Sequence, residues 1–253
     1  MTLLRISVVV GVLLACAAPQ PATTAGPRAP VVVELFTSDG CSSCPPADRV
    51  FSGLIERQPI PNAEVIALGL HVDYWDQLGW KDPASLASAT ARQQAYGRAW
   101  GGDRVYTPQA VVDGTAEMVG SDEAALRRAI ARAAAQPHAR VSETVAVDGH
   151  TVAVSVAVDA VPPAAKEPLD VLVFLTEDGL TSNVKFGENA GRTLHHDAVV
   201  RAMYPLGRLS PGATLQAHGP LAPGWRRDAL RAVALVQGHS TNRIWGAAST
   251  PVR

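Results

Sequence analysis

The chain has 253 residues, of which 47% are hydrophobic and 18% are charged, and its formal net charge is −1 at pH 7. This composition excludes an intrinsically disordered chain, and the length suits one large domain or two smaller ones. Because the net charge is close to zero, we expect neither a nucleic acid nor an anionic membrane surface as a partner.

The first residues have the pattern of a secretory signal peptide. Arg5 precedes an apolar stretch over residues 6–18, which is shorter than the ~20 residues of a membrane-spanning helix. We therefore predict a signal peptide over residues 1–18 and export to the periplasm. Two processing routes are possible. The segment LLAC resembles a bacterial lipobox, in which Cys16 is lipidated and anchors the protein to a membrane. Alternatively, cleavage at the small residues 23–25 removes Cys16.

Residues 19–30 are rich in Pro, Ala, Thr and Gly, which predicts a flexible linker. Either processing route leaves Cys41 and Cys44 as the two thiols of the mature chain. Outside the reducing cytosol, a disulfide between these two residues can persist.

A strand, a cysteine pair and a helix follow one another in residues 31–50. A run of β-branched residues predicts a buried strand, and Pro45 and Pro46 mark the first turn of a helix that extends to about Arg57. The positive end of a helix dipole favours a thiolate, which is the reactive form of cysteine. A C-x-x-C at this place predicts a thioredoxin-like redox pair. An inert disulfide and half of a zinc site are the alternatives, although no second cysteine pair is present to complete a zinc site.

The following residues continue an α/β pattern up to residue 137. The elements that we expect are a parallel second strand, an inserted surface helix, a hairpin after Pro108 and a final helix capped by Ser121, over residues 63–72, 84–100, 110–119 and 121–136.

Residues 71–83 form a segment dense in aromatic and acidic side chains. One interpretation is a loop beside the cysteines in which Asp73 and Trp75 contact the substrate. The other is that the tryptophans fill the core while their indole N–H groups bond to nearby carboxylates. We interpret His71 as a structural histidine at the end of a strand.

The segments ELFTSDGCSSCPPAD, HVDYWDQLGWKDP, YTPQ and GENAGRTLHHDAVVR resemble an uncharacterised bacterial family of exported thioredoxin-like proteins, named only as a domain of unknown function. This resemblance implies no particular activity. In the thioredoxin-like superfamily, the proline before the third core strand is cis and packs against the disulfide. The resemblance implies this conformation for Pro108, and it implies that Thr107 and Pro108 hold the extended chain of a partner.

Thioredoxins also carry a buried acid on the strand before the cysteines, which moves the proton of the second cysteine. Glu34 falls at that position when one extra residue is allowed in the turn. We therefore hypothesise that Glu34 is a desolvated carboxyl with a raised pKa that accepts the proton of Cys44. The alternative is that Glu34 lies in solvent at the end of the strand.

From residue 138 onward, alternating apolar residues and Asp-Gly turns predict short antiparallel strands. We expect a hairpin over residues 141–147 and 152–158, a strand over residues 169–176, another after the turn at residues 178–179, and a last pair over residues 230–236 and 243–248. The predicted fold class is therefore an α/β thioredoxin-like fold with an inserted helix over residues 31–137, followed by a sandwich-like β domain over residues 138–253. Alternatively, some of these strands extend the first sheet. Arg192, His195, His196 and Arg201 lie in a loop that we interpret as structural, with an anion site, or a metal site that includes Asp197, as alternatives.

Together these features predict an exported thiol–disulfide oxidoreductase that acts without a cofactor on protein or small-molecule thiols and disulfides. We expect Cys41 to be the more exposed cysteine and the attacking one, and Cys44 to resolve the mixed disulfide. Two alternatives stay open. One is a redox-inert protein that binds a ligand or partner, and the other is a copper-handling protein that uses Cys41, Cys44 and His71.

Overall fold

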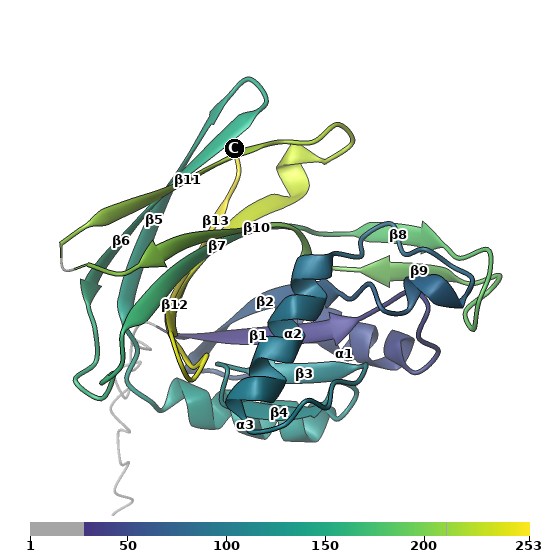
Figure 1. Cartoon of the computed structure of the whole chain (residues 1–253), viewed down its shortest axis with the longest axis horizontal. Helices are drawn as coiled ribbons and strands as arrows, with labels where there is room; N and C mark the ends of the chain where they lie inside the picture. Colours follow the sequence, from purple (N-terminus) through teal and green to yellow (C-terminus); the bar gives the residue numbers. More distant parts are fainter. Residues whose placement is uncertain (1–27, 211) are drawn as a thin grey trace, which may run out of the picture.

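The computed structural model describes residues 28–210 and 212–253 (Figure 1). The predicted signal peptide, the lipidation site Cys16 and nearly all of the predicted linker lie outside these residues. Of the described residues, 43% are in strands and 20% in helices. None of the described helices combines the length and the apolar character that crossing a membrane requires.

The N-terminal half contains the three α-helices of the described residues and four strands. Most follow the predicted boundaries closely, but α3 is capped by Asp122, which accepts the N–H of Ala125 at 2.8 Å, rather than by Ser121. The elements are β1 (Ala29–Thr37), α1 (Cys44–Arg57), β2 (Ala63–His71), α2 (Ala87–Ala99), β3 (Gln109–Val112), β4 (Ala116–Val119) and α3 (Glu123–Ala134), with a short 3-10 helix η1 (Asp76–Leu78).

The C-terminal half is built of strands. Its elements are β5 (Arg140–Asp148), β6 (Thr151–Ala160), β7 (Leu169–Glu177), β8 (Leu180–Asn183), β9 (Thr193–His196), β10 (Val199–Arg208), β11 (Thr214–Pro220), β12 (Leu230–Gly238) and β13 (Ile244–Pro251), with the 3-10 helix η2 (Arg227–Ala229). The predicted hairpin β5–β6 and the strands β7, β8, β12 and β13 are confirmed, whereas β9, β10 and β11 were not expected from the sequence.

The predicted fold class is wrong. Strands from both halves of the chain form one mixed eight-stranded sheet, in the order β13-β12-β7-β10-β2-β1-β3-β4, in place of an α/β thioredoxin-like fold followed by a separate β domain. The physical reason lies at β2, whose outer edge would otherwise present unpaired backbone groups. Gly69 of β2 pairs with Val199 of β10, and its N–H donates to Ala198 O at 2.7 Å. A Cβ on Gly69 would lie 3.0 Å from Asp197 O, so a larger residue would crowd this junction.

Three apolar clusters hold these layers together. The odd-numbered residues of β1 pack against α1 and α3 on one face of the large sheet, and its even-numbered residues face α2, which crosses the other face in Figure 1. A second sheet, β11-β6-β5, covers the β7–β12–β13 end of the large sheet. The hairpin β8–β9 lies between β7 and β10 in the chain and projects on the side of the molecule away from the second sheet in Figure 1, with β9 in contact with α1.

Candidate functional site

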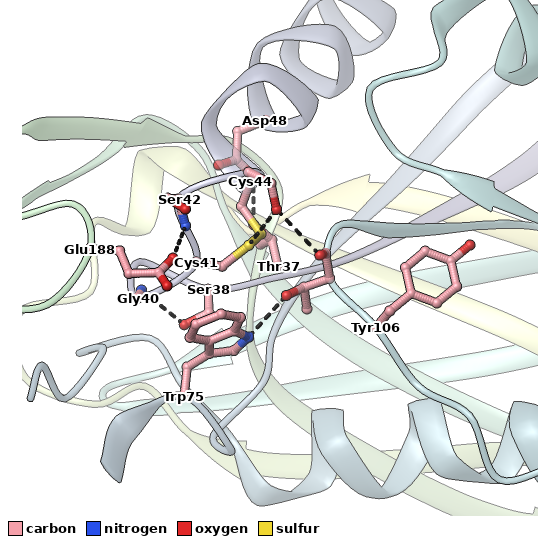
Figure 2. Close-up of a disulfide and its surroundings, with 12 residues drawn as sticks. Thr37, Ser38, Gly40, Cys41, Ser42, Cys44, Asp48, Trp75, Tyr106 and Glu188 are labelled. Carbon is pink, nitrogen blue, oxygen red and sulfur yellow. Dashed lines mark hydrogen bonds between the residues drawn. A yellow bond between two sulfur atoms is a disulfide. The ribbon is translucent and has the colours of Figure 1, made fainter. Parts of the chain in front are cut away.

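Cys41 and Cys44 form a disulfide at the N-terminus of α1, with their Cα atoms 5.4 Å apart (Figure 2). The turn between β1 and α1 is fixed by the backbone, because the Cys41 N–H donates to Ser38 O at 3.1 Å and the Cys44 N–H to Cys41 O at 3.2 Å. Cys44 is the first residue of α1, and the two prolines that follow occupy positions where a helix needs no N–H donor. The predicted placement of the cysteine pair between a strand and a helix is confirmed.

The prediction that Cys41 is the more exposed cysteine is wrong, because both cysteines have an exposed fraction of 0%. Ser42 and Ser43 between them are exposed, and Ser43 Oγ lies 3.3 Å from Cys41 Sγ. The side chain of Trp75 lies against the same turn, where a Cβ on Gly40 would come within 3.1 Å of Trp75 Cβ. A reagent therefore reaches the sulfurs only if this cover moves.

Two of the predicted substrate-binding residues, Trp75 and Thr107, lie beside the cysteine turn. The indole Nε1 of Trp75 donates to Thr107 Oγ1 at 2.9 Å, and Ser43 Oγ donates to Thr107 O at 3.5 Å (Figure 2). The Thr107–Pro108 peptide bond is cis, as the resemblance implied. The fourth residue, Asp73, is instead tied to α2, because its Oδ1 accepts a hydrogen bond from Thr90 Oγ1 at 2.6 Å.

The structure places Glu34 away from the cysteines. Its carboxylate is fully buried, which excludes the solvent-exposed alternative, and it faces α2, on the side of β1 opposite to α1. Arg92 of α2 donates to both carboxylate oxygens, at 2.5 and 3.1 Å, and the Tyr96 hydroxyl donates as well. Glu34 therefore belongs to a buried ion pair that ties α2 to the sheet, rather than to the proton chemistry of Cys44.

A different group of buried titratable residues lies on the cysteine side. We call it the acid–histidine cluster, and its members are Asp39, Asp48, His71, Asp82 and His196. The sequence pattern indicates structural roles for His71 and His196, and it does not mark the three acids as site residues. Asp39 is two positions before Cys41, and Asp48 is one helical turn after Cys44, which puts it on the same face of α1.

Direct contacts join the members of the acid–histidine cluster. His71 Nδ1 lies 2.7 Å from Asp82 Oδ2, and the Asp39 N–H donates to the same oxygen at 2.9 Å. His196 Nε2 lies 2.9 Å from Asp39 Oδ1, and its Nδ1 lies 3.7 Å from Asp48 Oδ2. The two imidazole rings meet edge to face, with their centroids 4.6 Å apart. A chain of polar contacts thus runs from α1 to the loop that carries Asp82.

The burial of these charges shifts their pKa values. Burial by itself lowers the pKa of His71, but the ion pair with Asp82 outweighs it and raises the pKa to about 9. Burial opposes ionisation of Asp82, but His71 outweighs it and lowers the pKa of this carboxyl to about 2. Burial raises the pKa of Asp48, against the effect of His196. At neutral pH, His71 is therefore an imidazolium that is paired with the carboxylate of Asp82.

The raised pKa of His71 predicts that stability depends on pH. The protein is treated with EDTA for this test, so that no metal ion affects the titration. The contribution of His71 to the free energy of unfolding is complete below the ordinary pKa of 6.5 and is lost as the pH rises through about 9. We expect a loss of about 3 kcal/mol across this window, measured by urea unfolding at a series of pH values. Asp82→Asn should abolish the slope, and the exposed-site variant His195→Gln should keep it. A flat profile in the wild-type protein would contradict the assignment.

The loop between β8 and β9 holds the cysteine turn in place. Asn189 Nδ2 donates to both Asp39 O, at 2.8 Å, and Cys41 O, at 2.9 Å. Glu188 accepts the Ser42 N–H at 3.0 Å (Figure 2). The expectation that this loop is structural is therefore incomplete, because it also contacts the cysteine turn. The unusual density of polar residues in GENAGRTLHH was the available signal that it reaches a site.

Comparison with other proteins gives a family and no activity. The model of the family "Protein of unknown function (DUF1223)" matches residues 32–237. A crystal structure of a protein from Agrobacterium tumefaciens is similar, with 28% identity, a TM-score of 0.68, and coverage of 90% of this chain and 97% of that one. HBP35 of Porphyromonas gingivalis has the same fold at 16% identity, with a TM-score of 0.66 and coverage of 90% and 77%. No curated protein matches the chain. The matched region exceeds half of the sequence, and this chain therefore belongs to the DUF1223 family.

Proposed function

We propose that this protein is a thiol–disulfide oxidoreductase that is exported to the periplasm and exchanges electrons with protein or small-molecule thiols and disulfides. The observation that carries the proposal is a C-x-x-C disulfide at the N-terminus of α1, with the buried carboxyl of Asp48 one helical turn beyond Cys44. The signal-peptide pattern in residues 1–18 supports export. The same segment contains Cys16, which would carry a lipid anchor if the lipobox is the processing site.

The small size of the disulfide loop favours a redox role over a stabilising one. The two cysteines are three positions apart in sequence. By loop-closure entropy, a bridge this short stabilises the folded state by about 2 kcal/mol, against about 3 kcal/mol for a 15-residue loop. A large protein with three apolar clusters has little need of such a bridge.

The exchange reaction uses two sulfur-transfer steps. The Cys41 thiolate attacks one sulfur of a substrate disulfide, forming a mixed disulfide and releasing the other substrate sulfur as a thiolate. The Cys44 thiolate then attacks Cys41 Sγ, which forms the Cys41–Cys44 disulfide and releases the second substrate thiolate. The protein loses two electrons, and the substrate gains them. The reverse sequence oxidises a substrate dithiol.

Asp48 is the base that we assign to Cys44. Residues four apart in a helix are neighbours, and Asp48 is also held by Thr37 Oγ1 at 2.9 Å from its Oδ1. Burial raises the pKa of Asp48, which brings it closer to the pKa of a thiol and makes proton exchange between the two groups easier. Substrate access requires movement of Trp75, whose hydrogen bond to Thr107 closes one side of the cysteine turn.

Asp48→Asn is expected to slow the resolving step and to change its pH dependence. The variant keeps the size of the side chain but removes the carboxylate that accepts the Cys44 proton. In stopped-flow reactions of the reduced protein with oxidised glutathione, formation of the intramolecular disulfide should slow by about 100-fold or more. Glu56→Gln, at an exposed site on the same helix, should leave the rate unchanged. An Asp48→Asn rate equal to that of the wild type would remove this role.

The burial of both sulfurs supports a second candidate function, a redox-inert scaffold in which the disulfide is structural. The reduction potential of the disulfide, measured by equilibrating the mature chain with glutathione buffers, distinguishes the oxidoreductase from the redox-inert scaffold. An oxidoreductase should have a reduction potential less negative than about −300 mV, whereas structural disulfides generally lie below that value. A potential below −300 mV would overturn the proposed function and favour the scaffold.

A further inference from the structure

A small cavity opens beside the acid–histidine cluster and is separate from the sulfur chemistry. Its volume is about 180 Å³, and its polar lining residues include Asp39, His71, Asp82, His196, Ser182 and Arg201. Such a volume holds a few water molecules or one hydrated ion. The cysteines are not among the residues that line it.

Three members of the cluster offer a set of metal ligands. Asp39, His71 and Asp82 each present one ligand atom, and these atoms lie within 4.8 Å of one another. All three side chains are buried, with exposed fractions of 0%, 1% and 2%. Imidazole nitrogen and carboxylate oxygen are both ligand types of Zn²⁺ and related divalent first-row cations, and three protein ligands leave a fourth position for water.

Two imidazole nitrogens at this cavity have no hydrogen-bond partner within residues 28–210 and 212–253. They are His71 Nε2 and His196 Nδ1, on rings with exposed fractions of 1% and 5%. A buried polar atom without a partner is costly, and most such atoms in proteins are paired with protein or with ordered water. Both rings line the cavity. A cation bound there would displace the His71 proton and become the partner of His71 Nε2, because an imidazole binds a metal only in its neutral form.

Hydrogen bonds from neighbouring groups hold the carboxylates of Asp39 and Asp82 in place. His196 Nε2 holds Asp39 Oδ1, while Trp80 Nε1 donates to Asp39 Oδ2 at 3.2 Å and Ser182 Oγ donates to the same oxygen. Asp82 is held by the N–H of Ala84 at 2.8 Å. Partners of this kind orient metal ligands and are part of a built site.

We propose that Asp39, His71 and Asp82 bind a divalent transition cation of the Zn²⁺ class, with a water-filled fourth position facing the cavity. His196 orients Asp39. The site does not depend on whether the disulfide is redox-active, and it is distinct from a copper site on the cysteines.

Zinc titration of the EDTA-treated, oxidised mature protein tests the proposal. Isothermal titration calorimetry with ZnCl₂ should show one equivalent bound, and zinc should raise the melting temperature, because a ligand that binds only the native state stabilises it. His71→Ala and Asp39→Asn should each weaken binding at least tenfold. His195→Ala, which removes an exposed neighbouring histidine, should bind zinc like the wild type.

Two further measurements keep the test decisive if a variant fails to fold. Co²⁺ added to the wild-type protein should give visible bands without a thiolate-to-cobalt charge-transfer band, and the Cys41→Ser/Cys44→Ser double variant should bind zinc with unchanged affinity. The absence of zinc binding by the wild type, a thiolate band, retained affinity in His71→Ala, or loss of binding in the double-serine variant would each overturn the site. None of these outcomes bears on the reduction potential, so the proposed function stands or fails separately.

Discussion

Cys41→Ser is expected to lower the rate of thiol–disulfide exchange to that of buffer alone. Cys41 precedes α1, at the positive end of the helix dipole, and in the proposed reaction its thiolate makes the first bond to the substrate. Without that sulfur no mixed disulfide forms by this route. The measurement is the reduction of oxidised glutathione by the reduced variant, followed by the appearance of free thiol.

Cys44→Ser provides the matched variant, because it removes the resolving sulfur and keeps the attacking one. It should react once and stop as a mixed disulfide between Cys41 and glutathione, which intact-mass spectrometry detects. The control variant Ser43→Ala keeps both cysteines and should therefore proceed to the intramolecular disulfide. If Cys41→Ser forms the mixed disulfide and Cys44→Ser does not, the roles of the two cysteines are reversed.

Glu34→Gln should have the largest effect on stability. The carboxylate is fully buried and bonded to Arg92 and Tyr96, so neutralising it leaves a buried guanidinium without its counter-charge. Breaking a buried ion pair in this way costs about 3–5 kcal/mol. Urea unfolding measures the loss, and Glu64→Gln, at an exposed site on β2, should change stability by less than about 0.5 kcal/mol.

The same variant separates stability from chemistry. Because Glu34 and α1 lie on opposite faces of β1, the pH profile of disulfide exchange should be the same in Glu34→Gln as in the wild type. A profile that moves with Glu34 and not with Asp48 would restore the hypothesis that Glu34 takes the Cys44 proton. A loss of stability below 1 kcal/mol would contradict the structural role of the ion pair.

Local patterns in the sequence predicted the elements that surround the disulfide. β1, α1, β2, β3 and α3 are where apolar runs, prolines and turn residues indicated them, because each pattern depends on neighbours in the chain. The overall architecture was not predictable in this way. The eight-stranded sheet depends on the pairing of β10 with β2, between residues such as Gly69 and Val199 that lie far apart in sequence.

The strand β10 shows why part of the C-terminal half escaped prediction. It contains Pro205, which cannot donate to a sheet, and its pairing with β7 shifts register between Pro205 and Gly207. These irregularities interrupt the alternation that marks a strand. The partner β7 has no such interruption and was expected at almost its observed bounds.

The candidate site was only partly visible in the sequence, because the face to which a strand residue points is fixed by tertiary structure. His195 and His196 are adjacent in β9, yet the first is exposed and the second reaches the acid–histidine cluster. Glu34 likewise points to the face of β1 opposite to the one that its proposed role required. The buried acid one helical turn from Cys44 is Asp48, which comes from the helix after the cysteines instead of the strand before them.

The pKa of the Cys41 thiol is the most direct test of the central claim that this cysteine pair is reactive. Rates of alkylation of the reduced mature protein, measured across pH with Cys44→Ser used to isolate Cys41, give this value. The helix dipole at the start of α1 predicts a pKa clearly below the ~8.5 of an unperturbed thiol. A pKa at or above ~8.5 would contradict the assignment of Cys41 as the attacking nucleophile.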